Sequence, residues 1–362
     1  MFTETKENPV LNYLPDRNKN GLILGRAGSG KSTLAKHEIK SLLSKDSNAK
    51  VYILDFESEY ASMATTLQSM GINANVVRIA PDSETHINPF DINISDNNDD
   101  SIVNAIAEKS DFICALCQSI MGEKHRLSSI GKSIIHRCVH NIYSNCFNCA
   151  NTTDKDISVN TELLPTIFDF YSLLIEQPEP EAQYIALSIE KFCFDGFFAH
   201  KTNVDTNARV IIYDIRGIGF CMEETASLIC LNHAWNEMIH NSKKGIRTWV
   251  YIDQLYPFTK SESSSAFLAK MWRRSRMQNG VLCGIAQSTK DLVKTESTRA
   301  IINNCEFVIM LSQSPIDRII LRDLYCLSDE QLKHIANQSL GHGLIYDEGE
   351  INPFEFNLFK TA

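Results

Sequence analysis

One segment near the start of the chain constrains its fold more than any other feature. Residues 25–32 read Gly-Arg-Ala-Gly-Ser-Gly-Lys-Ser, which matches the spacing GxxxxGK[ST] of a phosphate-binding loop. The apolar run Leu22–Leu24 precedes this loop, and a helical pattern over 33–39 follows it. Backbone N–H groups of such a loop and the positive end of the helix together bind a phosphate. The alternative, a dinucleotide fold, has the glycine spacing GxGxxG and does not need the Lys-Ser pair.

The loop therefore predicts a nucleoside triphosphate site. Lys31 can reach the β- and γ-phosphates, and the Ser32 hydroxyl can hold Mg²⁺. The residues expected to surround the nucleotide phosphates are Gly25, Arg26, Ala27, Gly28, Ser29, Gly30, Lys31, Ser32 and Thr33.

Composition limits the class of protein. A length of 362 residues allows two or three domains, or one large α/β domain with an insertion. The net charge of −9 argues against a broadly basic surface that coats nucleic acid, although a local basic groove remains open. Apolar runs such as 307–311 have the length of a strand and are too short to span a membrane. Because residues 1–8 are polar and do not resemble a signal peptide, we predict a cytoplasmic chain with cysteines as thiols.

Two cysteine pairs have spacings that occur in zinc sites. They are Cys114-x-x-Cys117 and Cys146-x-x-Cys149, with Cys138 and His140 between them. Residues 112–117, however, show the buried stripe of a helix without a glycine that would turn the chain around a metal. Free cysteine is among the most buried residue types, so we expect core packing here.

Strand and helix patterns alternate along both ends of the chain. Strands are expected at 51–55, 74–79, 209–214, 248–253, 281–286 and 307–311, with an edge strand at 343–346. Helices are expected from the loop to about residue 43 and at 60–69, 225–239 and 264–277. This alternation predicts a doubly wound α/β fold with a mainly parallel sheet.

The middle of the chain has a different pattern. Long amphipathic windows cover 102–121, 127–143, 166–176 and 181–194, with polar breaks at 148–156 and 177–180. A further polar run spans 95–100. We therefore predict a lead-in over 1–20, a core of 21–100 and 201–362, and an all-helical insertion over 101–200.

Three predicted strands end in aspartate, at Asp55, Asp214 and Asp253. A triphosphate hydrolase needs a carboxylate at a neighbouring strand end to hold Mg²⁺ through water. We predict that Asp253 has this role, because its strand is followed by the expected helix and strand; each of the three could instead cap its strand. The next residue is Gln254, which can orient water but cannot accept its proton.

Further polar residues follow on the next elements. Gln287, at the end of the strand 281–286, could face the γ-phosphate as a sensor or be a strand-end residue in a wet loop. Arg273 and Arg276 share one face of a predicted helix. They could act as arginine fingers on a neighbouring subunit's nucleotide, and a solvated basic helix face is the alternative.

Taken together, these motifs resemble a known family. The matching segments span about 16–357 and are the loop with its strand and the stretches 54–60, 78–81, 87–92, 251–253, 272–280, 284–292 and 317–318. They are similar to the C-terminal ATPase domain of the conjugation-channel traffic ATPases. These are the TraC/TraE-like energisers of type IV secretion, in the HerA–FtsK branch of RecA-like motors.

This resemblance implies a RecA-like P-loop NTPase core with a helical insertion, which uses ATP and Mg²⁺. It implies Asp253 as the acid associated with Mg²⁺, Gln287 as the sensor, and Glu57 near the edge of the nucleotide. Arginines at 273–276, Arg274 included, or Arg318 would lie near an intersubunit nucleotide. It also implies hexamers or dimers that dock on other channel subunits at the inner face of the cell membrane.

Two departures from the family pattern bear on activity. Members normally carry a long N-terminal domain that contacts the channel, so we expect this chain to be an excised domain or a stand-alone form. Members usually read Asp-Glu-Phe-His where this chain reads Asp253-Gln254-Leu255-Tyr256. We interpret this difference as natural divergence. Since a positioned general base typically contributes about 10²–10⁴ in rate, we predict good ATP–Mg²⁺ binding and slow hydrolysis.

Three functions remain as alternatives. The first is a motor subunit that powers conjugative transfer or channel assembly. The second is a scaffold subunit of the same apparatus, in which ATP orders an interface; Gln254 favours it. The third is a DNA-pumping coupling protein, which normally has transmembrane helices and a basic inner ring; the charge of −9 argues against such a ring. Direct DNA contact stays open.

Overall fold

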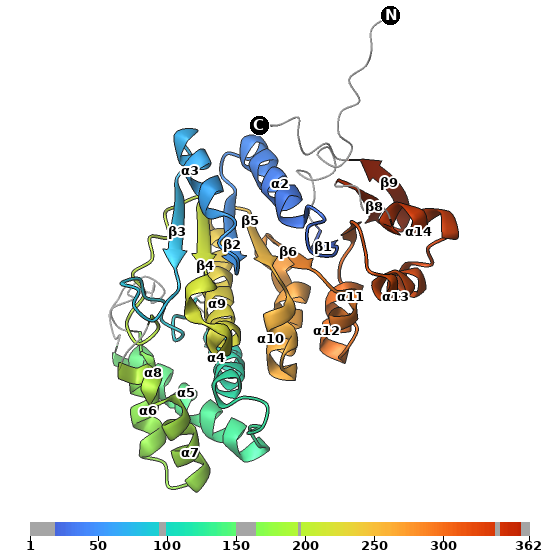
Figure 1. Cartoon of the computed structure of the whole chain (residues 1–362). Helices are drawn as coiled ribbons and strands as arrows, with labels where there is room; N and C mark the ends of the chain where they lie inside the picture. The colour runs from blue at the N-terminus through green and yellow to red at the C-terminus, as the bar shows by residue number, and fades with distance from the viewer. Residues whose placement is uncertain (1–18, 94–98, 150–163, 195–196, 337–340, 356–362) are drawn as a thin grey trace, which may run out of the picture.

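The structure is a computed structural model that describes residues 19–93, 99–149, 164–194, 197–336 and 341–355. Within these residues, nine strands form one sheet in the order β3-β4-β2-β5-β6-β1-β7-β8-β9 (Figure 1). Their bounds are β1 Gly21–Leu24, β2 Lys50–Asp55, β3 Ala74–Arg78, β4 Val210–Asp214, β5 Thr248–Asp253, β6 Gly280–Ala286, β7 Phe307–Met310, β8 His342–Asp347 and β9 Glu350–Glu355. Strands β1 to β7 pair in parallel, and β8 and β9 are antiparallel. The predicted mainly parallel α/β fold is confirmed.

Both faces of the sheet are buried. Successive side chains of a strand point to opposite faces, so a strand that is covered on both sides is apolar throughout. On β2, Val51 and Ile53 pack into one core, and Tyr52 and Leu54 pack into the other. This explains why the strands read as continuous apolar runs and not as an alternating pattern.

Helices cover the two faces unequally (Figure 1). Helices α2 (Lys31–Lys45) and α3 (Ala61–Ser69) lie on one face, where their buried side chains join the first core. The opposite face is covered by α9 (Glu223–Lys243), α10 (Glu262–Arg274), α11 (Thr289–Leu292) and α12 (Glu296–Asn303). Helices α13 (Pro315–Tyr325) and α14 (Asp329–Ala336) lie beside β8.

Between β3 and β4, the regular secondary structure of the described residues consists of helices alone. They are α4 (Asp99–Met121), α5 (Ser129–Cys149), α6 (Ile167–Ile175), α7 (Pro180–Ile189) and α8 (Lys191–Phe194). In Figure 1 they form a group below the sheet, where α4 contacts α9 and α10. An ion pair of 2.9 Å between Lys270 on α10 and Asp111 on α4 links the two groups of helices.

Three of the cysteines expected to pack in the core do so, whereas Cys146 is only partly buried. Cys114, Cys117 and Cys138 are buried members of the core. Within the described residues, no group of three potential metal ligands occurs. Over the same residues, none of the helices combines the length and the apolar character that crossing a bilayer requires.

Several boundaries differ from the sequence prediction. The strand predicted at 343–346 is not at the edge, because β8 pairs on its other side with β9, which the prediction lacks. The helix predicted at 181–194 is two helices, α7 and α8, and α10 ends at Arg274 instead of 277. Helices α11 to α14 were not predicted, because α11, α12 and α14 have only 4, 8 and 8 residues and α13, with 11 residues, buries only Asp317 and Leu321. Most of the lead-in over 1–20 and of the polar breaks at 95–100 and 148–156 lies outside the described residues.

A buried histidine attaches α9 to the sheet. The Tyr213 hydroxyl on β4 lies 2.6 Å from Nδ1 of His233 on α9. Burial lowers the pKa of His233 from 6.5 to about 4 and raises that of Tyr213 well above its usual value. The imidazole is therefore neutral in the folded protein, and its Nδ1 forms one hydrogen bond with the Tyr213 hydroxyl.

We predict that His233 makes the fold sensitive to acid. As pH falls from about 6.5 to about 4, the unfolded chain takes up a proton that the folded chain does not, which lowers the free energy of unfolding. The loss is about 3 kcal/mol, by the constant of 1.36 kcal/mol per pKa unit. Denaturant unfolding at pH 7 and pH 4.5 should show that the free energy of unfolding falls less in His233→Gln than in the parent at the lower pH. The exposed-site control His140→Gln should behave as the parent, and an equal loss in all three proteins contradicts the prediction.

Candidate functional site

The loop between β1 and α2 has the backbone geometry of a phosphate cradle. Gly28 and Gly30 have positive φ angles of 74° and 94°, which glycine adopts without a steric cost. Helix α2 begins directly after them at Lys31. The loop is fixed to the neighbouring strands, since Gly25 N donates to Ala286 O at 3.2 Å and Arg26 N to Ser312 O at 2.9 Å.

Side chains inside the loop also fit a phosphate. The Ser29 hydroxyl is buried and, among the described residues, has no hydrogen-bond partner. A Cβ at Gly25 would lie 2.5 Å from that hydroxyl, so the space beside it is open only because residue 25 is glycine. Lys31 is buried, and its ammonium donates to Arg26 O at 3.0 Å. Burial lowers the pKa of Lys31, and the charges of Asp253 and Glu59 oppose this shift.

The three strand-end aspartates lie in register on β4, β2 and β5. Asp55 is used by its own loop, because its carboxylate accepts the backbone N–H groups of Glu57, Glu59 and Tyr60 at 2.9–3.2 Å. Burial nevertheless raises its pKa, with these hydrogen bonds opposing the shift. Asp55 therefore fixes the loop that follows β2.

Asp214 and Asp253 have different surroundings. Asp214 accepts the Ser58 hydroxyl at 2.6 Å and the N–H of Arg216. Asp253 accepts the Tyr60 hydroxyl at 2.8 Å. Burial raises the pKa of Asp253, and the Tyr60 and Ser32 side chains oppose the shift. Of the three, Asp253 is the carboxylate whose pKa the loop serine affects, so Ser32 and Asp253 together offer the oxygen ligands that Mg²⁺ prefers.

Gln254 and Gln287 line one cavity of about 300 Å³ at the ends of β5 and β6. Gln254 has a positive φ of 89°, an uncommon conformation for a residue with a side chain. Its Nε2 donates to Glu57 Oε1 at 2.9 Å. Residues from β2, β5 and β6 therefore meet beside the loop that follows β1.

The predicted arginines are not equivalent. Arg274 and Arg276 form ion pairs with Glu108 and Glu306 of the same chain, whereas Arg273 is exposed. Arg276 lies in a 3₁₀ turn that directly follows α10, over Ser275–Gln278. Arg318 lies on α13, and its buried Nε has no partner among the described residues.

Sequence reasoning missed one member of this group. Tyr60 positions Asp253 but was interpreted only as the start of a helix, and Asp55, weighed as a metal-binding acid, instead holds the loop that contains Tyr60. The signal was the segment Asp55–Tyr60, in which an aspartate precedes three N–H groups that need acceptors at a turn into a helix.

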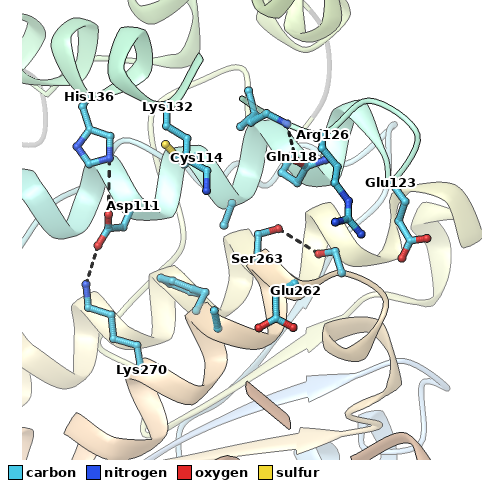
Figure 2. A pocket seen from close by; sticks show the side chains of 15 residues that line it. Asp111, Cys114, Gln118, Glu123, Arg126, Lys132, His136, Glu262, Ser263 and Lys270 are labelled. Carbon is cyan, nitrogen blue, oxygen red and sulfur yellow. Dashed lines mark hydrogen bonds and ion pairs between the residues drawn. The ribbon is translucent and has the colours of Figure 1, made fainter. Parts of the chain in front are cut away.

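A second cavity, of about 560 Å³, lies between α4, α5 and α10, away from the phosphate loop (Figure 2). Asp111 lies within 4 Å of two side-chain nitrogens there, His136 Nε2 at 3.6 Å and Lys270 Nζ at 2.9 Å. Its lining mixes both charge signs, with Glu123 and Glu262 near Arg126. We assign no ligand to it.

Comparisons with known proteins agree with this geometry. Residues 18–164 match the family model described as "Helicase HerA, central domain". The structure is similar to that of VirB4 from Thermoanaerobacter pseudethanolicus, with a TM-score of 0.74, 21% identity, and coverage of 93% of this chain and 89% of that one. The chain therefore has the VirB4 fold.

The conjugative coupling protein TrwB is also similar. Its unbound form matches with a TM-score of 0.60 and 13% identity, over 100% of this chain and 90% of that one. Its complex with ADP and Mg²⁺ matches with a TM-score of 0.58 and 15% identity, over 95% and 86%. A search of curated protein sequences gives no match. These findings confirm the predicted resemblance to the HerA–FtsK branch and its P-loop fold.

We predict that the Tyr60 hydroxyl stabilises an ionised Asp253. Tyr60→Phe removes a hydrogen bond to a buried carboxylate, which should lower the free energy of unfolding by about 1–3 kcal/mol. Tyr256→Phe is the control, since that tyrosine is exposed and its change should stay within about 0.5 kcal/mol. Denaturant unfolding of the nucleotide-free chain measures both, and equal losses in the two variants would rule out this role.

Proposed function

We propose that this chain binds ATP with Mg²⁺ and hydrolyses it, as an energising ATPase domain of a conjugation or type IV secretion apparatus. The observation that carries the proposal is the phosphate loop itself, with Gly28 and Gly30 at positive φ and Lys31 buried, beside the strand-end carboxylate of Asp253. The VirB4 match, which is stronger than the TrwB match, favours a channel energiser over a DNA-translocating coupling protein. The TrwB complexes with an ATP analogue, with a GTP analogue and with ADP and Mg²⁺ support a purine nucleotide with Mg²⁺.

In this proposal each residue of the loop has a defined task. The backbone N–H groups of residues 25–33 and the start of α2 bind the phosphates. Lys31 exchanges its bond to Arg26 O for the β- and γ-phosphates. Ser32 and Asp253 would hold Mg²⁺, which would supply charge neutralisation at the phosphates. Gln287 senses the γ-phosphate from the end of β6.

We further propose the assembly that the resemblance implies. Residues 101–200 would form an insertion in a core of 21–100 and 201–362, and the chain would assemble into hexamers or dimers. It would reach the inner face of the membrane through other channel subunits. The scaffold alternative, with ATP binding but little turnover, is favoured by one observation only, the glutamine at position 254.

The loop lysine provides the direct test. Lys31→Ala removes a charged contact to the phosphates and should raise the Kd for ATP at least about 30-fold, which corresponds to about 2 kcal/mol. Lys45→Ala, an exposed residue in the last turn of the same helix, is the matched control and should bind as the parent does. Calorimetry and phosphate release measure binding and turnover. Binding with Lys31-dependent turnover supports a motor, binding alone supports the scaffold, and no binding contradicts the proposal.

The same assay can distinguish the roles of Arg273 and Arg276. Since Arg276 is paired within its own chain, we propose Arg273 as the residue that reaches a neighbouring subunit's nucleotide. Arg273→Ala should lower turnover of the assembled protein by about 10³-fold with an unchanged Kd for ATP. Arg276→Ala should have a much smaller effect. Equal effects of the two substitutions would contradict this assignment.

A further inference from the structure

The residue after Asp253 is a glutamine and not a glutamate. The site nevertheless contains a carboxylate, because the glutamine amide contacts a second acidic residue. Gln254 Nε2 donates to Glu57 Oε1 at 2.9 Å. An amide nitrogen only donates hydrogen bonds, so its partner oxygen acts as an acceptor. The second oxygen of Glu57, Oε2, accepts no hydrogen bond from the described residues. It is therefore available to a water molecule.

The backbone around both residues is held in place. Gln254 N and Leu255 N both donate to Ile285 O on β6, at 3.2 and 3.0 Å, and this keeps Gln254 at its positive φ. Such uncommon conformations persist where the surrounding structure fixes them, and they concentrate at functional sites. Asp55 fixes Glu57 from the other side by accepting its N–H.

A nearby glutamate offers the obvious rival. Glu59 lies in the same loop, but its carboxylate pairs with Lys36 on α2 at 3.7 Å. Its charge acts on Lys31 and Asp253, and it makes no contact with Gln254 in the described structure. Glu57 is therefore the carboxylate that contacts Gln254 at the end of β5, whereas Glu59 pairs with Lys36 on α2.

We propose that Glu57 accepts the proton of the attacking water and that Gln254 is a positioning residue that orients it. This inference rests on the ATP hydrolysis proposed above. As the water oxygen bonds to the γ-phosphorus, one water proton moves to Glu57 Oε2. The bond from the γ-phosphorus to the bridging oxygen breaks, and ADP keeps the electron pair. Glu57 then releases its proton to solvent after phosphate leaves.

This assignment changes the sequence prediction for the site. With Glu57 as the proton acceptor, turnover does not need a carboxylate at position 254. A glutamate there would instead place two carboxylates side by side, which disfavours the ionised form of both. Gln254→Glu should therefore fail to raise turnover.

The first experiment separates binding from turnover in the full chain. Glu57→Gln should lower kcat about 100-fold or more, with the Kd for a fluorescent ATP analogue within about threefold of the parent. Gln254→Ala should lower kcat about tenfold, and the double variant should be no slower than Glu57→Gln alone. The distal exposed residue Glu176, replaced by Gln, is the control. Full activity of Glu57→Gln, or loss of activity in Glu59→Gln only, overturns the proposal.

The second experiment needs no nucleotide. Gln254→Glu should melt at a lower temperature than the parent at pH 8, with a smaller difference at pH 4, where the carboxyl groups become protonated. Adding Glu57→Gln to this variant should restore the melting temperature at pH 8. If the melting temperature is not restored, the contact between residue 254 and Glu57 is contradicted.

The outcomes of the two proposals are distinct. If the parent chain shows Lys31-dependent binding and turnover while Glu57→Gln is fully active, only the inference on Glu57 fails. If the parent binds ATP without turnover, the inference fails and the scaffold function stands. If the parent does not bind ATP, both fail.

Discussion

Parallel pairing of β1 with β6 and of β2 with β5 is the constraint on which the rest of the site depends. It brings the carboxyl ends of four strands to one edge, where ligands of open α/β sheets bind. The phosphate loop leaves β1 there, Glu57 follows β2, and Asp253 ends β5. Residues more than 190 positions apart in the chain, such as Glu57 and Gln254, meet for this reason.

A small set of hydrogen bonds then fixes the positions of the side chains at this edge of the sheet. Asp55 holds the loop after β2, and Tyr60 from the same loop reaches across to Asp253. The proposed acid for Mg²⁺, Asp253, and the proposed proton acceptor, Glu57, are therefore linked through one short segment, 55–60.

Much of the fold followed from the sequence, because buried parallel strands read as apolar runs and the phosphate loop has a fixed spacing. The short helices α11 to α14 and the strand β9 did not, since tertiary contacts decide short elements. At the site, the role of Asp253 stays a prediction, while Asp55 and Asp214 are bound by residues of the loop after β2. The contact of Gln254 with Glu57 could not be predicted, because it depends on strand order, which local patterns do not encode.

The most direct test of the account is an experimental structure of the chain with a non-hydrolysable ATP analogue and Mg²⁺. We predict that the triphosphate lies in the loop 25–33, that Ser32 binds the metal, and that Asp253 reaches it through water. Glu57 Oε2 should face a water beside the γ-phosphate, with Gln254 still bound to Oε1. A nucleotide bound elsewhere, or a metal without Ser32 and Asp253 around it, would contradict the account.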